Sequence, residues 1–323
     1  MKKISVIVPC YNEADTIDLF YKAIVRQAKL LQQYEFEFIF VDDGSNDATL
    51  AKLRALGSSD ERVRYISFSR NFGKESAMLA GFRASAGEYI LTMDADLQDP
   101  PDMIPEMLSA VVNEGFDCAA ARRVTREGES AVRSFFARRF YGIMDRISDV
   151  HLAQGERDFR IMTRRYLDDV LRLCEHNRFS KGIFAWVGYN TKWFEYKNVE
   201  RSAGTSSWSF KNLTKYALQG IISFSSFPAV FPAYAGAVTG AFSIVMAVIL
   251  LILKFGTSVS VNPLLWIVCL LVFLASLVFD FQGITGAYIT QALAEDRNRP
   301  QYLIKETDED KVELHSAQKD VLE

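Results

Sequence analysis

Two aspartates, Asp94 and Asp96, stand one residue apart directly after an apolar run at residues 89–93. Alternate residues of a strand point the same way, so a turn that begins at Asp96 lets both carboxylates reach one ion. Hard oxygen ligands suit Mg²⁺ or Mn²⁺, and Mg²⁺ usually joins one or two protein carboxylates to substrate phosphates. The pair therefore suggests diphosphate chemistry, against the alternative of an ordinary acidic surface turn.

Polar residues also follow the first apolar run, at residues 4–8, which Pro9 closes. The ring of Tyr11 can lie against a flat base. The carboxylate of Glu13 can accept a hydrogen bond from a base or a ribose. These residue types suggest a place for a nucleoside.

The second apolar run, at residues 36–41, ends in Asp42 and Asp43. Their carboxylates can accept hydrogen bonds from ring N–H or hydroxyl groups. Residues 43–47 also fit a turn that leads into a helix N-cap, and both interpretations can hold together. Lys74 follows the third apolar run, where it either meets a phosphate or is solvated.

Apolar runs alternate with helical patterns over the first 121 residues. Strands are expected at residues 4–8, 36–41, 63–67, 89–93 and 117–121, and helices at 13–33, 47–56 and 75–85. This order predicts an α/β fold with a mostly parallel, doubly wound sheet. Ligands of such sheets lie beyond the carboxyl ends of the strands. We therefore expect the loops at Pro9, Asp42 and Asp94 to line one pocket.

Composition limits the classes of protein. The 323 residues carry a net charge of −3, which argues neither for nor against nucleic acid. The first half has no basic run interleaved with aromatic residues, and no nucleic-acid partner is expected. The four cysteines are far apart and form no C-x-x-C pair. This suggests neither a zinc knuckle nor a redox pair, and it indicates a reducing compartment. The N-terminus lacks the apolar core of a signal peptide.

The second half of the chain suggests a membrane. Residues 229–253 and 263–279 contain no charge, and each segment is close to the ~20 residues needed to cross ~30 Å of hydrocarbon. They predict a transmembrane hairpin at about 229–253 and 263–288, with buried core helices as the alternative. Basic residues are more frequent outside the pair than in its link, which places both termini in the cytoplasm.

Residues 122–150 interleave arginines with aromatic and aliphatic residues. This pattern predicts an amphipathic basic helix or helix pair. Such a helix either packs on the sheet as an ordinary surface helix or lies in the membrane interface. The segment 306–323 is charged, and we expect it to be poorly ordered.

Taken together, four motifs resemble the family 2 glycosyltransferases with the GT-A (Rossmann-like) fold: VPCYNE at 8–13, VDDGSND at 41–47, RNFGKESAMLAGF at 70–82 and DADLQDPP at 94–101. The resemblance continues through RDFR at 157–160, RSAGTS at 201–206 and NRPQY at 298–302. The full set is similar to polyprenyl-phosphate glycosyltransferases, which include dolichol-phosphate mannose synthases and bacterial undecaprenyl-phosphate glycosyltransferases. Two positions depart from the pattern, because Ser207 replaces a frequent lysine and Ala287 a frequent glutamate.

The resemblance implies four sets of site residues. The nucleotide-sugar is bound by Pro9, Tyr11, Glu13, Asp42, Asp43, Lys74, Asp94 and Ala95. Mg²⁺ or Mn²⁺ is bound by Asp94, Asp96 and Gln98. The phosphate or acceptor is bound by Arg122, Arg133, Arg160, Arg201 and Ser206. The catalytic residues are Asp96, Asp158 and Arg160. Asp158 acts as a base, orients Arg160 or the acceptor, or forms a plain salt bridge with Arg157 or Arg160.

The resemblance implies an inverting, metal-dependent transfer of a hexose from a nucleotide-sugar, UDP-glucose or a related UDP-hexose, to polyprenyl phosphate. The reaction is expected at the cytoplasmic face of the inner (plasma) membrane, in service of cell-envelope glycan modification. The partners are the donor, the lipid acceptor and the bilayer, and the resemblance suggests a homo-oligomer such as a tetramer.

The predicted domains are a nucleotide-sugar-binding core at 1–121, an acceptor-binding part at 122–228, the hairpin at 229–290 and a cytoplasmic tail at 291–323. One alternative is a processive polysaccharide synthase, but the chain has no Q-x-x-R-W motif and one hairpin cannot enclose a channel. Another is a non-catalytic membrane scaffold or flippase partner, which the intact acidic motifs disfavour. A soluble nucleotidyltransferase conflicts with the hairpin.

Overall fold

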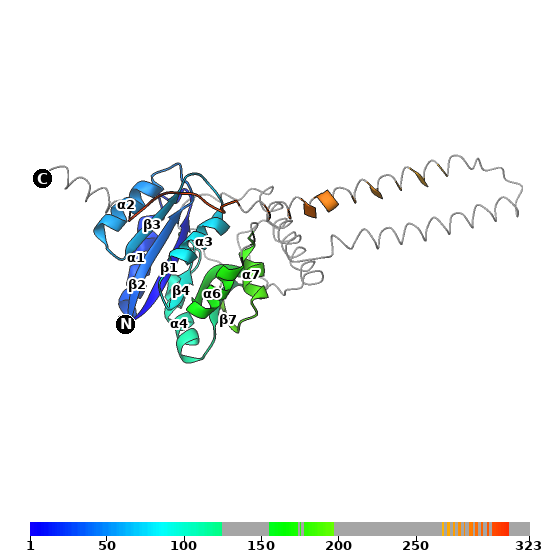
Figure 1. Cartoon of the computed structure of the whole chain (residues 1–323). Helices are drawn as coiled ribbons and strands as arrows, with labels where there is room; N and C mark the ends of the chain where they lie inside the picture. Colours follow the sequence, from blue (N-terminus) through cyan, green and yellow to red (C-terminus); the bar gives the residue numbers. More distant parts are fainter. Residues whose placement is uncertain are drawn as a thin grey trace, which may run out of the picture.

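The computed structural model describes residues 1–124, 155–173, 178–196 and 299–309, together with Glu175 and single positions between 267 and 296. In this part of the chain, eight strands form one sheet with helices on both faces (Figure 1). The strands are β1 (Lys2–Cys10), β2 (Tyr34–Asp42), β3 (Val63–Phe68), β4 (Tyr89–Thr92), β5 (Cys118–Arg123), β6 (Glu156–Thr163), β7 (Thr191–Tyr196) and β8 (Ile304–Thr307). The helices are α1 (Ile17–Leu30), α2 (Thr49–Ser59), α3 (Lys74–Ala84), the short 3-10 helix η1 (Pro101–Met103), α4 (Ile104–Asn113), α6 (Arg164–Arg172) and α7 (Ser180–Trp186).

The strand order in the sheet is β7-β5-β6-β4-β1-β2-β3-β8. β4, β1, β2 and β3 are parallel, whereas β6 and β8 run antiparallel to their neighbours β4 and β3. The predicted α/β class and mostly parallel sheet are therefore confirmed. β1 lies between β2 and β4, so the loops that begin at Pro9, Asp42 and Asp94 share one edge of the sheet, as expected.

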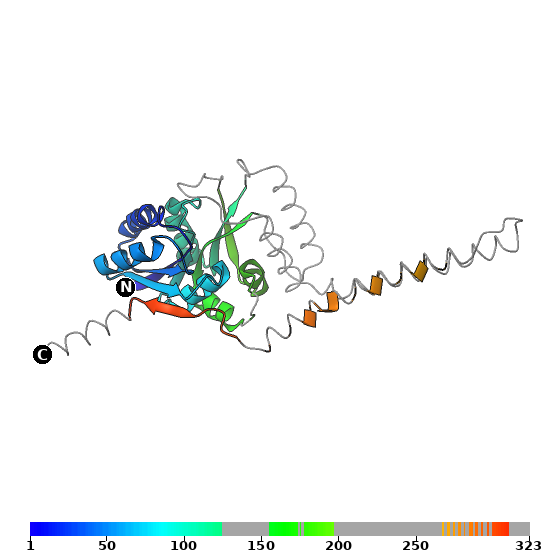
Figure 2. The ribbon, with the colours of Figure 1, turned by 90° about the horizontal axis from the view of Figure 1, so that it is seen from above.

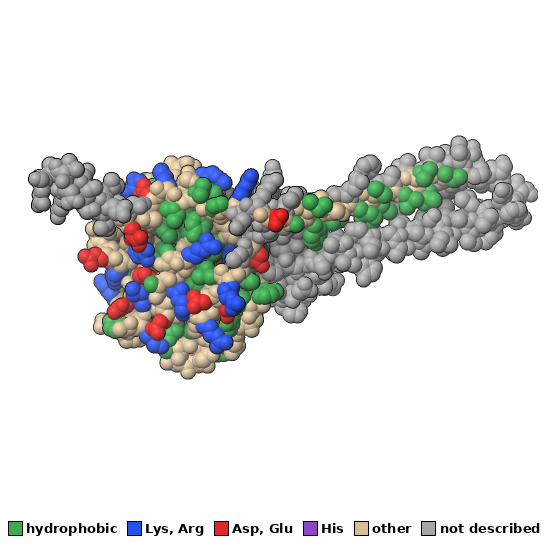
Figure 3. All heavy atoms as spheres, in the orientation of Figure 1, with side chains coloured by type: hydrophobic (Ala, Val, Ile, Leu, Met, Phe, Trp, Pro, Cys, Tyr) green, Lys and Arg blue, Asp and Glu red, His purple; other side chains and the backbone are tan. Residues whose placement is uncertain are grey.

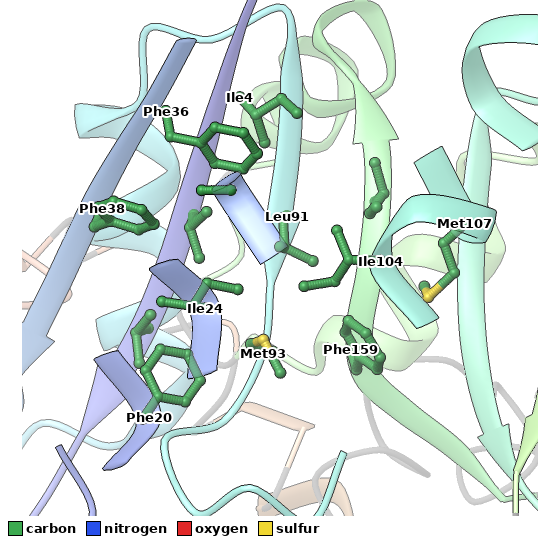
Figure 4. Packing of buried hydrophobic residues seen from close by; sticks show 14 of the residues in the cluster. Ile4, Phe20, Ile24, Phe36, Phe38, Leu91, Met93, Ile104, Met107 and Phe159 are labelled. Carbon is green, nitrogen blue, oxygen red and sulfur yellow. The ribbon is translucent and has the colours of Figure 1, made fainter. Parts of the chain in front are cut away.

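The sheet separates two apolar layers because successive strand residues point to opposite faces. In β1, Val6 and Val8 pack with α1 and α4 on one face, and Ile7 packs with α3 on the other. Figure 4 shows the first layer, in which Phe20 of α1 and Ile104 of α4 approach the strands. The helices form the outer layers of a three-layer arrangement, which Figure 2 shows from above. This packing fixes the strand ends that carry the polar motifs.

The predicted strands and helices of the first 121 residues all appear, and their ends differ from expectation by a few residues. The C-terminal segment differs more. We expected poor order from residue 306 onward, which is wrong for residues 306–309. Glu306 lies in β8, paired with Ser67 of β3, and its carboxylate accepts two hydrogen bonds from Arg54 at 2.7 and 2.6 Å. A charged sequence therefore forms a strand because backbone pairing and ion pairs hold it at the sheet edge.

Among the described residues, no helix is long and apolar enough to cross a membrane. The span expected at 229–253 lies outside the described residues, and only single helical positions of the span expected at 263–288 are described. Residues 125–150 of the expected amphipathic segment also lie outside them. The hairpin, the interface helix and the domain boundaries that depend on them stay predictions.

Two helical glycines test how the helices pack on the sheet. A Cβ at Gly81 of α3 would lie 2.3 Å from Cγ2 of Ile7, whereas a Cβ at Gly57 of α2 would lie 3.4 Å from its nearest atom, the Val63 carbonyl oxygen. We expect Gly81→Ala to lower the free energy of unfolding by about 1–3 kcal/mol because α3 must move away from β1. Gly57→Ala should raise it by up to about 1 kcal/mol because alanine favours the helix.

The measurement is the denaturant-induced unfolding of the purified chain, compared among the wild type and the two variants. The two substitutions make the same chemical change inside a helix. Effects of the same sign would therefore contradict the close approach of α3 to β1.

Candidate active site

The loop after β4 carries the acidic pair. One carboxylate oxygen of Asp96 accepts a hydrogen bond from the backbone N–H of Gln98 at 3.1 Å, and Leu97 between them has a φ of 57°. Such a φ lies in the left-handed region, so the chain turns tightly after Asp96. The turn predicted to begin at Asp96 is confirmed. The side chain of Asp94 is 21% exposed, whereas Asp96 is buried.

Asp158 reaches the same place through the antiparallel pairing of β6 with β4. The register aligns Thr92 with Arg160. Continued past the end of β4, the same register aligns Asp94 with Asp158. Lys74, the first residue of α3, lies between these carboxylates, with Nζ 2.6 Å from Asp94 Oδ1 and 2.5 Å from Asp158 Oδ2. Three segments that are distant in the sequence therefore meet at one ammonium group.

This cluster stabilises its own charged forms. Burial by itself lowers the pKa of a lysine and raises that of a carboxylate. Against burial, Asp158 and Asp94 raise the pKa of Lys74 above its usual value. Burial likewise opposes ionisation of Asp158, yet the positive charges of Lys74, Lys181 and Arg160 lower the pKa of Asp158 below its usual value. The group is thus an ion-pair cluster at neutral pH.

The two arginines that flank Asp158 take other partners. Asp158 pairs with a lysine, so the alternative of a plain salt bridge with Arg157 or Arg160 is wrong about the partner. Arg160 is only 1% exposed and pairs with Glu156 at 2.6 Å. Its guanidinium carbon lies 3.7 Å from the ring centre of Phe184. The side chain is enclosed by these groups, and its contact with an acceptor phosphate stays a prediction.

Sequence reasoning missed a buried network behind Asp94. Arg157 donates from Nε to Asp99 Oδ1 at 3.0 Å, and its Nη2 lies 3.8 Å from Asp94 Oδ2. The hydroxyl of Tyr196, on β7, donates to the same oxygen of Asp99. Asp99 belongs to the DADLQDPP motif, which was the one sequence signal for it. The pairing of strands that brings Arg157 and Tyr196 to Asp99 leaves no such signal.

The remaining predicted phosphate and acceptor ligands are not brought to this cluster by the described structure. Arg122 of β5 pairs with Glu195 of β7, and its Nε donates at 3.0 Å. Within the described residues, its guanidinium contacts Glu195 rather than the acidic turn, which is the turn that carries Asp94 and Asp96. Arg133, Arg201 and Ser206 lie outside the described residues. The roles of all four in binding stay predictions.

A polar cavity of about 330 Å³ lies beyond the ends of β2 and β3. Its volume falls at the lower end of the ~300–1,000 Å³ range of ligand pockets. The lining includes Asp42 at the end of β2, Ser45 and Arg70 from the loops after β2 and β3, and Lys305 from β8. Asp42 is 1% exposed and accepts hydrogen bonds from the Ser67 hydroxyl at 2.8 Å and the Ser45 N–H at 3.1 Å. Its carboxylate is therefore held firmly at the wall of the cavity.

Asp43 and Gly44 join the two loops that form the cavity. The carboxylate of Asp43 accepts hydrogen bonds from the N–H groups of Phe72 at 2.7 Å and Gly73 at 2.9 Å. Burial raises the pKa of Asp43 to about 6, against these hydrogen bonds. Gly44 has a φ of 67°, and a Cβ there would lie 2.3 Å from the carbonyl carbon of Arg70. These contacts give Asp43 a structural role, and its predicted contact with the donor stays a prediction.

The loop after β1 lies beside the cavity. Asn12, with a φ of 54°, donates its N–H to the Ser45 hydroxyl at 2.9 Å. Pro9, near the end of β1, and Tyr11 and Glu13, in the loop, are each partly exposed. The side chains proposed for nucleotide binding therefore lie between the cavity and the acidic turn, because β1 lies between β2 and β4.

The acidic turn fits a divalent cation that is shared with a substrate. Among the described residues, no group of three or more His, Cys, Asp and Glu side chains could hold a metal ion alone. Asp94 and Asp96 offer two carboxylates on either side of the buried Ala95, and Asp94 already accommodates the ammonium group of Lys74. Two carboxylates completed by substrate phosphates are a common Mg²⁺ site.

Comparison with known proteins gives one matching family and several similar proteins. Residues 5–172 match the family described as glycosyl transferase family 2. The chain is 39% identical to the "Putative glycosyltransferase CsbB" of Bacillus subtilis, covering 94% of this chain and 91% of that protein. It is 38% identical to the "SfII prophage-derived bactoprenol glucosyl transferase" of Shigella flexneri, covering 94% and 98%. Among solved structures, a glucosyl-3-phosphoglycerate synthase from Mycobacterium tuberculosis in complex with Mn²⁺, UDP-glucose and phosphoglyceric acid overlaps with a TM-score of 0.46 at 20% identity, covering 68% of this chain and 78% of that chain.

The position of Lys74 yields a stability prediction. Lys74→Met leaves Asp94 and Asp158 facing each other without a positive charge. Breaking a fully buried pair costs roughly 3–5 kcal/mol, and these side chains keep some contact with solvent, so we expect a loss of about 2 kcal/mol. Mg²⁺ or Mn²⁺ should then raise the thermal midpoint of Lys74→Met more than that of the wild type, because the ion can occupy the place of the ammonium group.

The measurement is thermal unfolding of the purified chain with and without each cation. Lys192→Met is the matched control, since Lys192 pairs with Glu114 at 2.7 Å on the surface. It should change stability by less than about 1 kcal/mol and show no metal-dependent gain. Equal metal responses in both variants would contradict the assigned position of Lys74 between the two carboxylates.

Proposed function

The chain belongs to glycosyl transferase family 2, and from this premise we propose that it transfers glucose from UDP-glucose to a polyprenyl phosphate at a membrane surface. We infer the identities of the acceptor and the sugar from relatives named bactoprenol glucosyl transferases, to which the chain is similar over nearly its whole length. The geometry supports the donor, because a polar cavity and an acidic turn lie along one edge of one sheet. In this proposal the fold is the GT-A form of the α/β sheet.

The spacing of strands supports a nucleotide lying across the sheet edge. β1 alone separates β2 from β4, and neighbouring strands are about 4.8 Å apart, so the two ends of the site are about 10 Å apart. A nucleoside diphosphate placed along this edge has its base in the cavity beside Asp42. Its ribose then lies over the loop of Tyr11 and Glu13, and its diphosphate reaches Asp94 and Asp96.

Asp94 and Asp96, with Gln98, would hold Mg²⁺ or Mn²⁺, and the ion would neutralise charge on the leaving UDP. A phosphate monoester has a second pKa of about 6, so the lipid phosphate is largely dianionic at neutral pH. One of its oxygens forms a bond to C1 of glucose while the bond from C1 to the UDP oxygen breaks. This single displacement inverts the configuration and releases UDP. No proton has to be removed, so Asp158 can serve to position Lys74.

Exposed apolar residues support a membrane location. Ile267, Leu271, Leu274 and Val278 are helical positions with large exposed side chains. Their spacing of four, three and four residues places them on one face of a helix. Figure 3 shows green side chains along the described part of residues 267–296, away from the catalytic sheet. A lipid-embedded hairpin, with the sheet and both termini on the cytoplasmic side, would bring the enzyme to an acceptor that exists only at the membrane surface.

The reaction predicts a labelled lipid product. Radiolabelled UDP-glucose and polyprenyl phosphate, incubated with the purified chain and Mg²⁺ or Mn²⁺, should give a lipid whose label is released by mild acid. Chelation of the metal, and Asp94→Ala together with Asp96→Ala, should each lower the rate by about 100-fold or more, because the leaving diphosphate is no longer neutralised.

The matched control is Asp102→Ala, which removes a nearby exposed carboxylate that pairs with Arg26. Its rate should stay within about twofold of the wild type, because exposed ion pairs contribute little. Label that accumulates in polymer would instead favour a processive synthase. Full activity of the double alanine variant with chelator present would overturn the proposed metal site.

Substitution of Asp158 tests separately whether the reaction uses a catalytic base. Asp158→Asn weakens the hold on Lys74, so we expect turnover to fall by about tenfold. The dependence of turnover on pH should keep the wild-type shape between about pH 7 and 9, because the acceptor is already dianionic. The opposite result has two parts: the wild-type rate follows the ionisation of one group between about pH 7 and 9, and the Asp158→Asn rate does not. That result would show that Asp158 accepts a proton.

A further inference from the structure

β8 joins the catalytic sheet from outside the segment that matches the family. It pairs antiparallel with β3, and the Ser69 N–H donates to the Leu303 carbonyl at 3.0 Å. The side chain of Arg54 on α2 holds Glu306 of β8 through two hydrogen bonds of 2.7 and 2.6 Å. Figure 2 shows this strand, in orange-red, lying along the edge of the domain. Residues 303–307 are thereby fixed beside the cavity.

A bulge in this strand determines where Lys305 lies. Phe68 is aligned with Ile304 and Ser67 with Glu306, so Lys305 is the additional residue between two paired positions. Bulges change the direction of a side chain and are frequent beside active sites. Lys305 lines the polar cavity beyond β2 and β3.

The residues just before β8 hold the bulge in place. The ring of Tyr302 stacks on Phe68, with ring centres 4.9 Å apart and an interplanar angle of 13°. The side-chain amide of Gln301 donates to the Glu175 backbone carbonyl at 2.7 Å, and the backbone carbonyl of Gln301 accepts from the Ser76 hydroxyl at 3.1 Å. The backbone on the N-terminal side of Lys305 is therefore anchored, as the Arg54 pair anchors the C-terminal side.

The two basic residues of the cavity differ in their freedom to bind a ligand. The Arg70 guanidinium lies 3.9 Å from the ring centre of Phe72 and donates to the Asn71 carbonyl at 2.9 Å, so it is folded onto its own loop. Lys305 is exposed. Its charge, after that of Arg54, helps to lower the pKa of the neighbouring Glu306. An ammonium group has three donors and no acceptor, which suits carbonyl or hydroxyl oxygens of a ligand.

We propose that Lys305 binds the nucleoside part of the nucleotide donor by donating a hydrogen bond to an oxygen of the base or the ribose. The proposal rests on the proposed function for the existence of a uridine nucleotide donor. The cavity lies at the β2–β3 end of the sheet edge, with β1 between it and the acidic turn, so Lys305 meets the nucleoside rather than the diphosphate. The C-terminal strand thereby becomes a wall of the donor site.

Calorimetric titration of the purified full chain with UMP and with UDP tests this assignment. Lys305→Ala should raise the Kd of both nucleotides by the same factor, roughly tenfold, because one charge-assisted hydrogen bond is lost. Lys305→Arg should restore most of the affinity, because it keeps a charged donor. The control is Lys29→Ala, which should leave both Kd values unchanged. Lys29 is an exposed lysine in the last turn of α1, just before β2 begins, and so lies toward the other end of the strands from the cavity.

The outcomes separate this proposal from the one on which it rests. Unchanged affinity in Lys305→Ala, or a much larger loss for UDP than for UMP, would overturn the assignment while leaving the donor in place. A wild-type chain that binds neither nucleotide would overturn the donor itself, and this assignment with it.

A second measurement asks whether β8 acts through Lys305. Arg54 does not line the cavity, so Arg54→Ala affects the nucleotide only by loosening β8. We expect Arg54→Ala alone to raise the Kd of UDP a few-fold. In a chain that already carries Lys305→Ala, Arg54→Ala should cause no further rise in this Kd. Losses that multiply in the double variant would contradict the proposed route.

Discussion

The Lys74 ammonium group holds the carboxylates of Asp94 and Asp158 in place at one edge of the sheet. Asp94 and Asp158 face each other at the ends of β4 and β6, and two like charges about 4 Å apart repel by about 4 kcal/mol at an effective dielectric constant of 20. An ammonium group within 2.6 Å of both replaces this repulsion with two attractions. Because Lys74 begins α3, the pairing also fixes the start of that helix against two strand ends. The position of the acidic turn depends on this arrangement.

Two different surfaces lie along the sheet edge that is proposed to bind the donor. On one side of β1, Asp42 and the loops after β2 and β3 enclose a polar cavity. On the other side, Asp94 and Asp96 stand at a turn that is braced by Arg157 and Asp99. β1 sits where the strand order changes direction, which is where doubly wound sheets bind their ligands. In the proposed binding mode, the flat base and the anionic diphosphate of a nucleotide-sugar would therefore meet two chemically different surfaces.

Local patterns in the sequence were enough to predict the central strands, because β-branched and apolar runs bounded by turn residues have few other solutions. The turn at Asp96 followed from the same reasoning. The partner of Asp158 did not, because it depends on the register of β6 against β4, which no local pattern encodes. β8 was missed for a related reason. Ile304–Thr307 contains two charged residues, and only the pairing with β3 and the clamp by Arg54 make it a strand.

The burial of Arg160 bears on how Asp158 works. Desolvating an ion pair is costly, and here the pair with Glu156 and the stacking on Phe184 offset that cost. Arg160 is thereby held away from solvent, yet its charge helps to lower the pKa of Asp158, as those of Lys74 and Lys181 do. A carboxylate kept ionised by several cations is a weak proton acceptor. Asp158 is better suited to anchoring Lys74 beside the acidic turn, and an acceptor that arrives as a dianion has no need of a base.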